Sequence, residues 1–279
     1  MTLKVLITGA SGYVGARIFA DLSEAHTVTG TFHTNRLRPN LLEVDIRDRK
    51  AVLDIVSKTM PDAIIHAAAI PSIKLCESAP KQAILTNVRG TRNVVDAANA
   101  NDAVVFYLSS FGALEPTTVY GRTKFEGEQQ ARKAHAGYNI LRLSVAFGCS
   151  PNTENDRPFN RILRTLIKGK PVGYDNLWKF SPTYLGHVSS TIRAMLRRGI
   201  KGKTIGIAVP ERKSMYQIAS DILGAFGEKA RPINQRWKTR RIEEEPFSPN
   251  QYGLPACSYE EMIRAIRKEI LASGIISTT

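Results

Sequence analysis

Two hydrophobic patterns alternate along the first half of the chain: short apolar runs, and longer segments whose apolar residues recur every three or four positions. The runs are rich in β-branched residues and predict buried strands at residues 3–8, 26–32, 41–46, 62–69, 103–110 and 139–148. The longer segments predict helices at residues 16–25, 48–59, 79–100 and 118–135, the second with Asp48 as its N-cap. Nearly continuous apolar strands that alternate with helices predict a parallel sheet covered by helices on both faces.

The pattern changes after Gly148. A polar loop at 149–159 precedes predicted helices at 160–169, 186–196, 214–226 and 258–273, the last capped by Ser258, and predicted strands at 172–174 and 204–209. Residues 231–253 read as irregular. We therefore expect a Rossmann-type doubly wound α/β domain at residues 1–148 that binds NAD(P). Residues 149–279 are expected to form a smaller substrate-binding lobe, interleaved with the last strands of the sheet.

Composition narrows the class of protein. Hydrophobic residues make up 43% of the chain, yet no apolar run approaches the roughly 18 residues needed to span a bilayer. The segment MTLKVLITGASG enters a strand with no basic region followed by an apolar block, so we expect a cytoplasmic location. Cys76, Cys149 and Cys257 are widely spaced and odd in number, which indicates reduced thiols and neither a disulfide framework nor a metal site.

The net charge of +14 is unevenly shared, with 17 basic and 13 acidic residues in 1–150 against 22 and 12 in 151–279. A basic second half suggests an anionic partner: nucleic acid, a membrane surface or a phosphorylated small molecule. The basic residues are scattered, and no aromatic-interleaved basic stripe or nucleic-acid motif is present. We therefore expect a small-molecule substrate and neither nucleic acid nor a membrane as partner.

A glycine-rich segment, TGASGYVG at residues 8–15, joins the first predicted strand to the first helix. Glycines here permit a tight turn, close approach of the backbone to a pyrophosphate, and close packing of helix on strand. The helix N-terminus offers free N–H groups and the positive end of its dipole to the phosphates. The segment predicts a dinucleotide site that includes Gly9, Ser11, Gly12, Tyr13, Val14 and Gly15.

The end of the second predicted strand lacks the acid that this motif usually has. An Asp or Glu about 20 residues after the glycines normally binds the adenosine ribose hydroxyls. Here the segment GTFHTNRLR offers His33, Arg36 and Arg38 instead. A guanidinium suits a 2′-phosphate through bidentate, charge-assisted hydrogen bonds, so NADP(H) is favoured over NAD(H).

These motifs together resemble the extended short-chain dehydrogenase/reductase superfamily. Within it, VYGRTKFEGE and FSPTYLGHVSSTIRAML look most like the dTDP-4-dehydrorhamnose reductases and their relatives. The resemblance implies that the VDI segment at residues 44–46 contacts adenine and that the HAAA turn at residues 66–69 lines the cofactor. It also implies that Asn87 is the asparagine that the family has in its central helix. It also implies a homodimer formed through the helix near 80–100 and the catalytic helix. The residues carried over as cofactor contacts are Asp45, Ile46, Ala67, Ala68, Ala69 and Asn87.

Tyr120 and Lys124 lie one helical turn apart and share a helix face. A cation at ~4 Å, with an effective dielectric near 20, contributes about 4 kcal/mol, or about three pK units. We therefore expect Lys124 to lower the pKa of Tyr120 from about 10 towards 7. The resemblance implies that Tyr120 is the proton donor and that Lys124 also holds the nicotinamide ribose. It gives Ser110 the role of stabilising the oxyanion, or Ser109 if the strand end is offset by one.

The chain also departs from the family's pattern. Only ten positions separate Ser110 from Tyr120, whereas most family members have a much longer connection that lines the sugar pocket. We therefore expect a pocket that is more open, or one that another segment fills. The basic second half offers further candidates to face a nucleotide diphosphate: Arg157, Asn160 and Arg161, together with Asn155, Lys168 and Arg212.

The favoured interpretation is an NADPH-dependent reductase of a keto group, on a nucleotide-linked deoxysugar. One alternative is an NAD-dependent nucleotide-sugar epimerase or dehydratase of the same superfamily, against which the missing acid after the second strand counts. Another is a non-catalytic cofactor-binding regulatory subunit. The short connection is compatible with that alternative, whereas the presence of Ser110, Tyr120 and Lys124 argues for catalysis.

Overall fold

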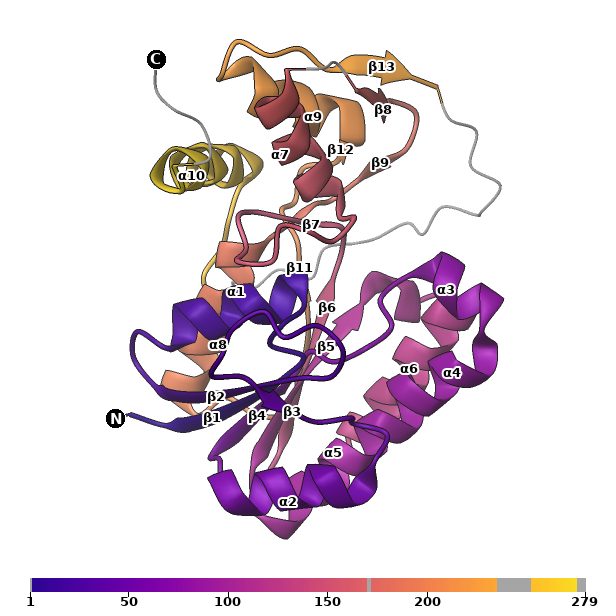
Figure 1. The fold of residues 1–279 in the computed structure, drawn as a ribbon, viewed down its shortest axis with the longest axis vertical. Helices are drawn as coiled ribbons and strands as arrows, with labels where there is room; N and C mark the ends of the chain where they lie inside the picture. The colour runs from indigo at the N-terminus through magenta and orange to yellow at the C-terminus, as the bar shows by residue number, and fades with distance from the viewer. Residues whose placement is uncertain (1, 170–171, 235–251, 275–279) are drawn as a thin grey trace.

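The computed structural model describes residues 2–169, 172–234 and 252–274 (Figure 1). Seven strands form one fully parallel sheet in the order β11-β6-β5-β4-β1-β2-β3, which confirms the doubly wound α/β fold. In chain order these strands are β1 (Lys4–Thr8), β2 (Thr27–Phe32), β3 (Leu42–Glu43), β4 (Ala63–His66), β5 (Val104–Ser110), β6 (Tyr138–Leu143) and β11 (Lys203–Ile207).

Helices cover both faces of the sheet (Figure 1). One face carries α1 (Tyr13–Leu22) and α8 (Leu185–Arg198), and the other carries α2 (Arg49–Thr59), α5 (Thr91–Ala100) and α6 (Val119–Ala131). Because side chains alternate along a strand, Val5 and Ile7 of β1 pack under α1 and α8, while Leu6 packs under α2 and α5. Two apolar cores therefore lie on either side of one sheet.

The region before α5 is more broken than its sequence predicts. The helix expected over 79–100 is present, but it divides into α4 (Pro80–Ile84), a π-helical turn η1 (Leu85–Gly90) and α5. A short helix that was not predicted, α3 (Ile73–Ser78), precedes it. A Cβ at Gly90 would lie 2.7 Å from the Cδ1 atom of Ile46, so the π turn sits where the helix passes closest to the segment after β3.

The connection from β5 to α6 is direct. A 3-10 turn, η2 (Phe111–Ala113), follows β5, and α6 begins after its N-cap Thr118, whose hydroxyl accepts a hydrogen bond from Gly121 N at 3.0 Å. Glu77 of α3 accepts a second one from Val119 N at 2.7 Å. Both interactions satisfy N–H groups in the first turn of α6 and so fix the start of that helix beside the end of β5.

Within the second half of the chain, α8 and β11 belong to the sheet and its cover, and other segments form a smaller lobe above the sheet (Figure 1). Its helices are α7 (Pro158–Lys168), α9 (Met215–Gly224) and α10 (Tyr259–Ala272). Its short strands pair as β7 (Ala146–Phe147) with β10 (Thr183–Tyr184), β8 (Gly173–Asp175) with β13 (Arg231–Ile233), and β9 (Lys179–Phe180) with β12 (Lys213–Ser214). Its core holds side chains from α7, α9 and α10 together with Tyr13 of α1. The division into a cofactor domain and a substrate lobe stays a prediction.

Two predicted helix caps are present, and two predicted segments have other bounds. Asp48 and Ser258 are the N-caps of α2 and α10, as predicted. The single strand expected over 139–148 is two strands, β6 and β7, because residues after β6 leave the sheet to pair with β10. Of the segment expected to be irregular, residues 231–233 form β13, while 235–251 lie outside the described residues. In the part of the chain that the structure describes, no helix combines the length and the apolar character needed to cross a membrane.

Candidate active site

The glycine-rich turn forms a tight cradle at the carboxyl end of β1. Gly9 has φ +70°, and a Cβ there would lie 2.7 Å from the Cα atom of Ala68. A Cβ at Gly15 would lie 2.2 Å from the carbonyl oxygen of Gly9. Gly12 is the N-cap of α1. Because glycine has no side chain, it makes no capping hydrogen bond to the N–H groups of the first turn. This cradle fits a pyrophosphate, which binds to free N–H groups at a helix N-terminus.

Three further residues of the turn face in different directions. The carbonyl oxygen of Ser11 accepts a hydrogen bond from Asn152 Nδ2 at 2.6 Å. Tyr13 is buried and its hydroxyl donates to Gly148 O at 2.7 Å, so this phenol serves the packing of the second lobe. Val14 is half-buried between the two apolar clusters. The Tyr13 hydroxyl is therefore occupied within the protein, and the contact of Tyr13 with a cofactor stays a prediction.

The basic residues after β2 lie on an exposed loop. The Arg36 guanidinium donates to Pro39 O and lies 5.8 Å from the centre of the Phe32 ring. The Arg38 guanidinium lies 5.9 Å from the centre of the Phe19 ring. Both arginines are exposed and therefore accessible to a ligand at the adenosine end of the cradle.

Arg47 is a residue of this region that the sequence reasoning missed. Its guanidinium binds Asp45 in a bidentate manner, with Nε–Oδ1 at 2.9 Å and Nη2–Oδ2 at 2.7 Å, and Nη2 lies 3.3 Å from His33 Nε2. The hydrogen bond from Arg47 holds the pKa of Asp45 below its usual value. The carboxylate predicted to contact adenine is thus already paired with a cation. The available signal was the position of Arg47 directly after the buried Ile46.

The HAAA turn after β4 packs against the cradle, and Asn87 of η1 binds the segment that follows this turn. Ala67 N donates to Thr8 O at 3.1 Å, and Ala68 lies against Gly9, while Ala69 is half-buried. Asn87 is 1% exposed: its Oδ1 accepts from Ile70 N at 2.8 Å. Its Nδ2 donates to Ile70 O at 3.2 Å and to Thr123 Oγ1 at 3.1 Å. Asn87 therefore ties the segment after β4 to α6, and its contact with the cofactor stays a prediction.

The two serines that end β5 face opposite sides, as neighbours on a strand must. Ser109 is buried and donates to Glu128 Oε1 at 2.6 Å. Ser110 is half-buried at the carboxyl edge of the sheet, where its hydroxyl accepts from Gly112 N at 3.2 Å. The Tyr120 ring lies beside the same glycine, because a Cβ at Gly112 would be 3.6 Å from Ser110 Oγ and 3.8 Å from Tyr120 Cε1. The geometry therefore selects Ser110 over Ser109 as the partner of Tyr120.

The expectation that Lys124 lowers the pKa of Tyr120 is wrong for this structure. Lys124 is 4% exposed, its Nζ donates to Leu108 O at 2.6 Å, and it lies 4.3 Å from the centre of the Tyr107 ring. Burial raises the pKa of Tyr120, whereas its hydrogen bond with Ser110 and the charge of Arg157 lower it. Burial also lowers the pKa of Lys124 itself to about 7, against the opposing charge of Glu128. The cation that acts on the phenol in this state is Arg157.

Beneath Lys124 lies a buried ion pair that the sequence reasoning did not single out. Glu128, with no exposed surface, binds Arg142 of β6 at 2.8 Å and 2.7 Å, and also accepts from Ser109. Glu128 follows Tyr120 and Lys124 at intervals of four on α6, so all three share the face that packs on β5 and β6. The pair anchors α6 to the sheet.

The candidate substrate residues have different surroundings. Arg161 pairs with Asp156 at 2.5 Å, and Asn160 is buried, with its Nδ2 donating to Asn152 O and Asn155 O. Arg157 is half-buried and reaches Pro71 O of the first domain at 3.4 Å. Lys168 ends α7 and is exposed, and Arg212 donates to Lys179 O at 3.0 Å. Of Arg157, Asn160 and Arg161, only Arg157 has a hydrogen bond to the segment that precedes α3.

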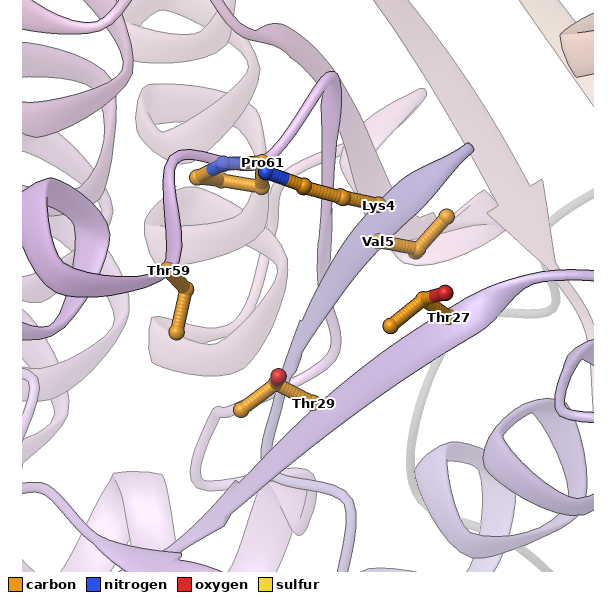
Figure 2. A pocket seen from close by; sticks show the side chains of 6 residues that line it. All are labelled: Lys4, Val5, Thr27, Thr29, Thr59 and Pro61. Carbon is orange, nitrogen blue, oxygen red and sulfur yellow. The ribbon is translucent and has the colours of Figure 1, made fainter. Parts of the chain in front are cut away.

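A hollow of about 140 Å³ lies elsewhere, at the opposite edge of the sheet (Figure 2). It is lined by the first residues of β1 and β2 and by the end of α2: Lys4, Val5, Thr27, Thr29, Thr59 and Pro61. Figure 2 shows the Lys4 side chain extending towards Pro61 across this hollow. It contains no candidate catalytic residue. Across the described ranges, no group of three or more His, Cys, Asp or Glu residues is placed to hold a metal ion.

Sequence comparison finds a matching family and several similar proteins. The family model of the RmlD substrate binding domain matches residues 3–256. The beta subunit of methionine adenosyltransferase 2 from Mus musculus is 28% identical over 243 residues, covering 80% of this chain and 72% of that protein. A probable low-salt glycan biosynthesis reductase from Haloferax volcanii is 29% identical over 220 residues, covering 72% of this chain and 73% of that protein.

Solved structures share the fold. A dTDP-4-dehydrorhamnose reductase from Bacillus anthracis, in complex with NADP, superposes with a TM-score of 0.82 at 20% identity, covering 98% of this chain and 99% of the other. A UDP-glucose 4-epimerase from Thermus thermophilus, complexed with NAD, gives 0.78 at 18% identity, covering 97% and 100%. At these identities the likeness concerns the fold alone. The similar folds include both NADP- and NAD-bound proteins.

Proposed function

The chain belongs to the RmlD substrate binding domain family, and on that premise we propose that it uses NADPH to reduce a keto group on a nucleotide-linked sugar. The observation that carries the proposal is that Ser110 and Tyr120 converge on Gly112, where a Cβ would lie 3.6 Å from Ser110 Oγ and 3.8 Å from Tyr120 Cε1. Both residues lie at the carboxyl edge of the sheet, the edge from which the glycine-rich turn also leaves β1. A proton donor and an oxyanion partner are thus paired at the edge that carries the cofactor cradle.

The residues present fit a nicotinamide dinucleotide. Gly9, Gly12 and Gly15 would hold the pyrophosphate against the first turn of α1, and exposed Arg36 would bind the 2′-phosphate. Lys124 would contact the nicotinamide ribose. When bound, this cofactor supplies the hydride that reduces the carbonyl carbon.

Proton transfer is assigned to this chain's own side chains. Tyr120 gives its phenolic proton to the substrate oxygen, and Ser110 donates a hydrogen bond to the same oxygen as negative charge develops. Burial raises the pKa of Tyr120, which keeps the phenol protonated at neutral pH before reaction. The product is an alcohol, and the tyrosinate that remains regains its proton from solvent.

A second candidate function is a non-catalytic, cofactor-binding subunit. It is favoured by the similarity to the beta subunit of methionine adenosyltransferase 2 and by the short connection of ten positions from Ser110 to Tyr120. The epimerase alternative has less support, because His33, and no acid, follows β2.

Under any of these functions we propose a homodimer formed through α4, α5 and α6, where the side chains of Ile84 and Phe125 are exposed. Sedimentation equilibrium would test this proposal.

The experiment is a fluorescence titration of the nucleotide-free protein with NADPH and, separately, NADH, followed by assays on 4-keto nucleotide sugars. We expect tighter binding of NADPH, weakened in Arg36→Ala but not in the control Arg92→Ala, whose arginine is exposed on α5. NADPH oxidation coupled to keto-sugar reduction supports the reductase. Preference for NADH or NAD⁺ would instead favour the epimerase, and binding without turnover would favour the subunit.

A further inference from the structure

Three arginines lie at the start of α7, and one of them differs from the others. Asp156 binds Arg161 at 2.5 Å and Arg164 at 3.0 Å, so both guanidinium groups are paired with the same carboxylate. Arg157 has no carboxylate within ion-pair distance among the residues that the structure describes. Its one side-chain hydrogen bond there is Nη1 to Pro71 O, at a long 3.4 Å. A guanidinium has five N–H donors, so most of the binding capacity of Arg157 is unused within this part of the chain.

The backbone that carries Arg157 is firmly attached to the cofactor cradle. Ser150 Oγ donates to Tyr13 O at 2.7 Å, and Asn152 Nδ2 donates to Ser11 O at 2.6 Å. Asn160 Nδ2 then donates back to Asn152 O and Asn155 O, which closes the loop onto the first turn of α7. The base of the Arg157 side chain is therefore fixed, whereas its end is held by a single long hydrogen bond.

This side chain crosses from the second lobe to the catalytic residues. Pro71, its hydrogen-bond partner, precedes α3 in the first domain, and α7 lies in the lobe above it (Figure 1). Ile70, next to Pro71, packs in the same small cluster as Tyr120 and is held by Asn87 at 2.8 Å. The positive charge of Arg157 acts on the hydroxyls of both Tyr120 and Tyr13. The end of the Arg157 side chain is thus bound beside Ile70, whose apolar cluster includes Tyr120.

We propose that Arg157 binds the anionic group of the substrate, a phosphate of the nucleotide diphosphate, while Arg161 and Arg164 do not contact it. This proposal rests on the proposed function and adds the residue that recognises the charged part of the substrate. A planar guanidinium binds phosphate oxygens in a bidentate manner, and the uncapped N-terminus of α7, which begins directly after Arg157, adds favourable potential. Substrate binding exchanges the weak hydrogen bond to Pro71 for charge-assisted ones.

The test titrates NADPH-saturated protein calorimetrically with dTDP and with inorganic pyrophosphate. The variants are Arg157→Gln, Arg157→Lys and the control Arg161→Gln, and NADPH affinity is measured for each. We expect Arg157→Gln to weaken dTDP binding about 10- to 100-fold, as for loss of hydrogen bonds to a charged group, and Arg157→Lys to weaken it less. Arg161→Gln should change it by less than about 3-fold, and NADPH affinity should stay the same in all variants.

The outcomes separate this proposal from the proposed function. Unchanged dTDP binding in Arg157→Gln overturns the role of Arg157 and leaves the reductase proposal standing. A loss of NADPH affinity equal to the loss of dTDP affinity also overturns it, because Arg157 would then serve the cofactor. Binding of pyrophosphate but not dTDP by the unaltered protein, lost in Arg157→Gln, supports the anion ligand and contradicts a dTDP-linked substrate. Binding of neither anion overturns the proposal.

Discussion

Replacement of Lys124 by methionine should make the cofactor-free protein more stable while removing its activity. The ammonium is 4% exposed, and its pKa is lowered from 10.5 to about 7 by burial. At about 1.4 kcal/mol for each pKa unit, the folded state disfavours the charged lysine by about 4–5 kcal/mol. Methionine is unbranched and of similar length, so it keeps the contact with the Tyr107 ring without the charge.

The effect on melting temperature follows from the size of the chain. An unfolding entropy of about 2.1 cal/mol/K per residue, for 279 residues, gives about 0.6 kcal/mol/K. A gain of 4–5 kcal/mol therefore raises Tm by about 7–8 °C at pH 6. The cation that contacts the ribose in the proposed mechanism is lost in the same variant, so NADPH-dependent reduction should fall with the gain in stability.

The pH dependence of the Tm difference shows whether the buried charge of Lys124 causes the gain in stability. Between pH 7 and 10.5 the unfolded chain holds the lysine proton more tightly than the folded chain, so the stability of the unaltered protein rises with pH in this window. The cost of burying the charge is complete below pH 7 and disappears towards pH 10.5. The difference in Tm between Lys124→Met and the unaltered protein should therefore be largest at pH 6 and shrink by pH 10.

The assay is thermal unfolding followed by circular dichroism at pH 6, 8 and 10, without cofactor. Titrating groups that Lys124 does not influence are common to both proteins and cancel in the difference. The control is Lys133→Met, an exposed lysine just after the same helix, which should change Tm by less than about 1 °C. A Tm for Lys124→Met at or below that of the unaltered protein at pH 6, or a difference that does not vary with pH, would refute the reasoning.

Three further predictions follow from the same contacts. Tyr120→Phe should lower the NADPH-dependent turnover at least about 100-fold with little change in NADPH affinity, and unchanged turnover would exclude Tyr120 as the acid. Arg142→Met leaves Glu128 buried without its cation and should lower stability by about 3–5 kcal/mol in chemical denaturation, whereas Arg264→Met, at an exposed pair, should cost less than about 1 kcal/mol. Gly15→Ala places a Cβ 2.2 Å from Gly9 O and should weaken NADPH binding at least about 10-fold, while Gly224→Ala, with nothing within 4 Å of its Cβ, should bind NADPH normally; equal affinities would contradict the cradle.

Much of the fold was predictable because its signals are local. The apolar runs of the strands, the helical spacing between them and the caps Asp48 and Ser258 depend on residues adjacent in the chain. The glycine-rich turn is equally local, because its backbone conformation and its position between β1 and α1 are set by neighbouring residues. The same holds for the spacing of Tyr120 and Lys124 on one helix face.

The local sequence pattern was less informative for segments whose conformation depends on residues far away in the chain. The π turn at 85–90 lies against Ile46, about forty residues earlier, and β7 leaves the sheet to pair with β10 from the second lobe. The short helix α3 gains support from Glu77, which caps α6. None of these partners is visible in the periodicity of the segment itself.

The sequence by itself determined which residues share an element, and therefore the doubly wound sheet, the cradle and the set of polar groups at its edge. The tertiary structure decided what each charge and hydroxyl contacts: Ser110 rather than Ser109 partners Tyr120, Lys124 points to Leu108 O, and Arg157 supplies the cation near the phenol. Periodicity depends on positions within one strand or helix. Burial, ion pairing and the pKa of a side chain depend on elements far apart in the chain, which only packing brings together.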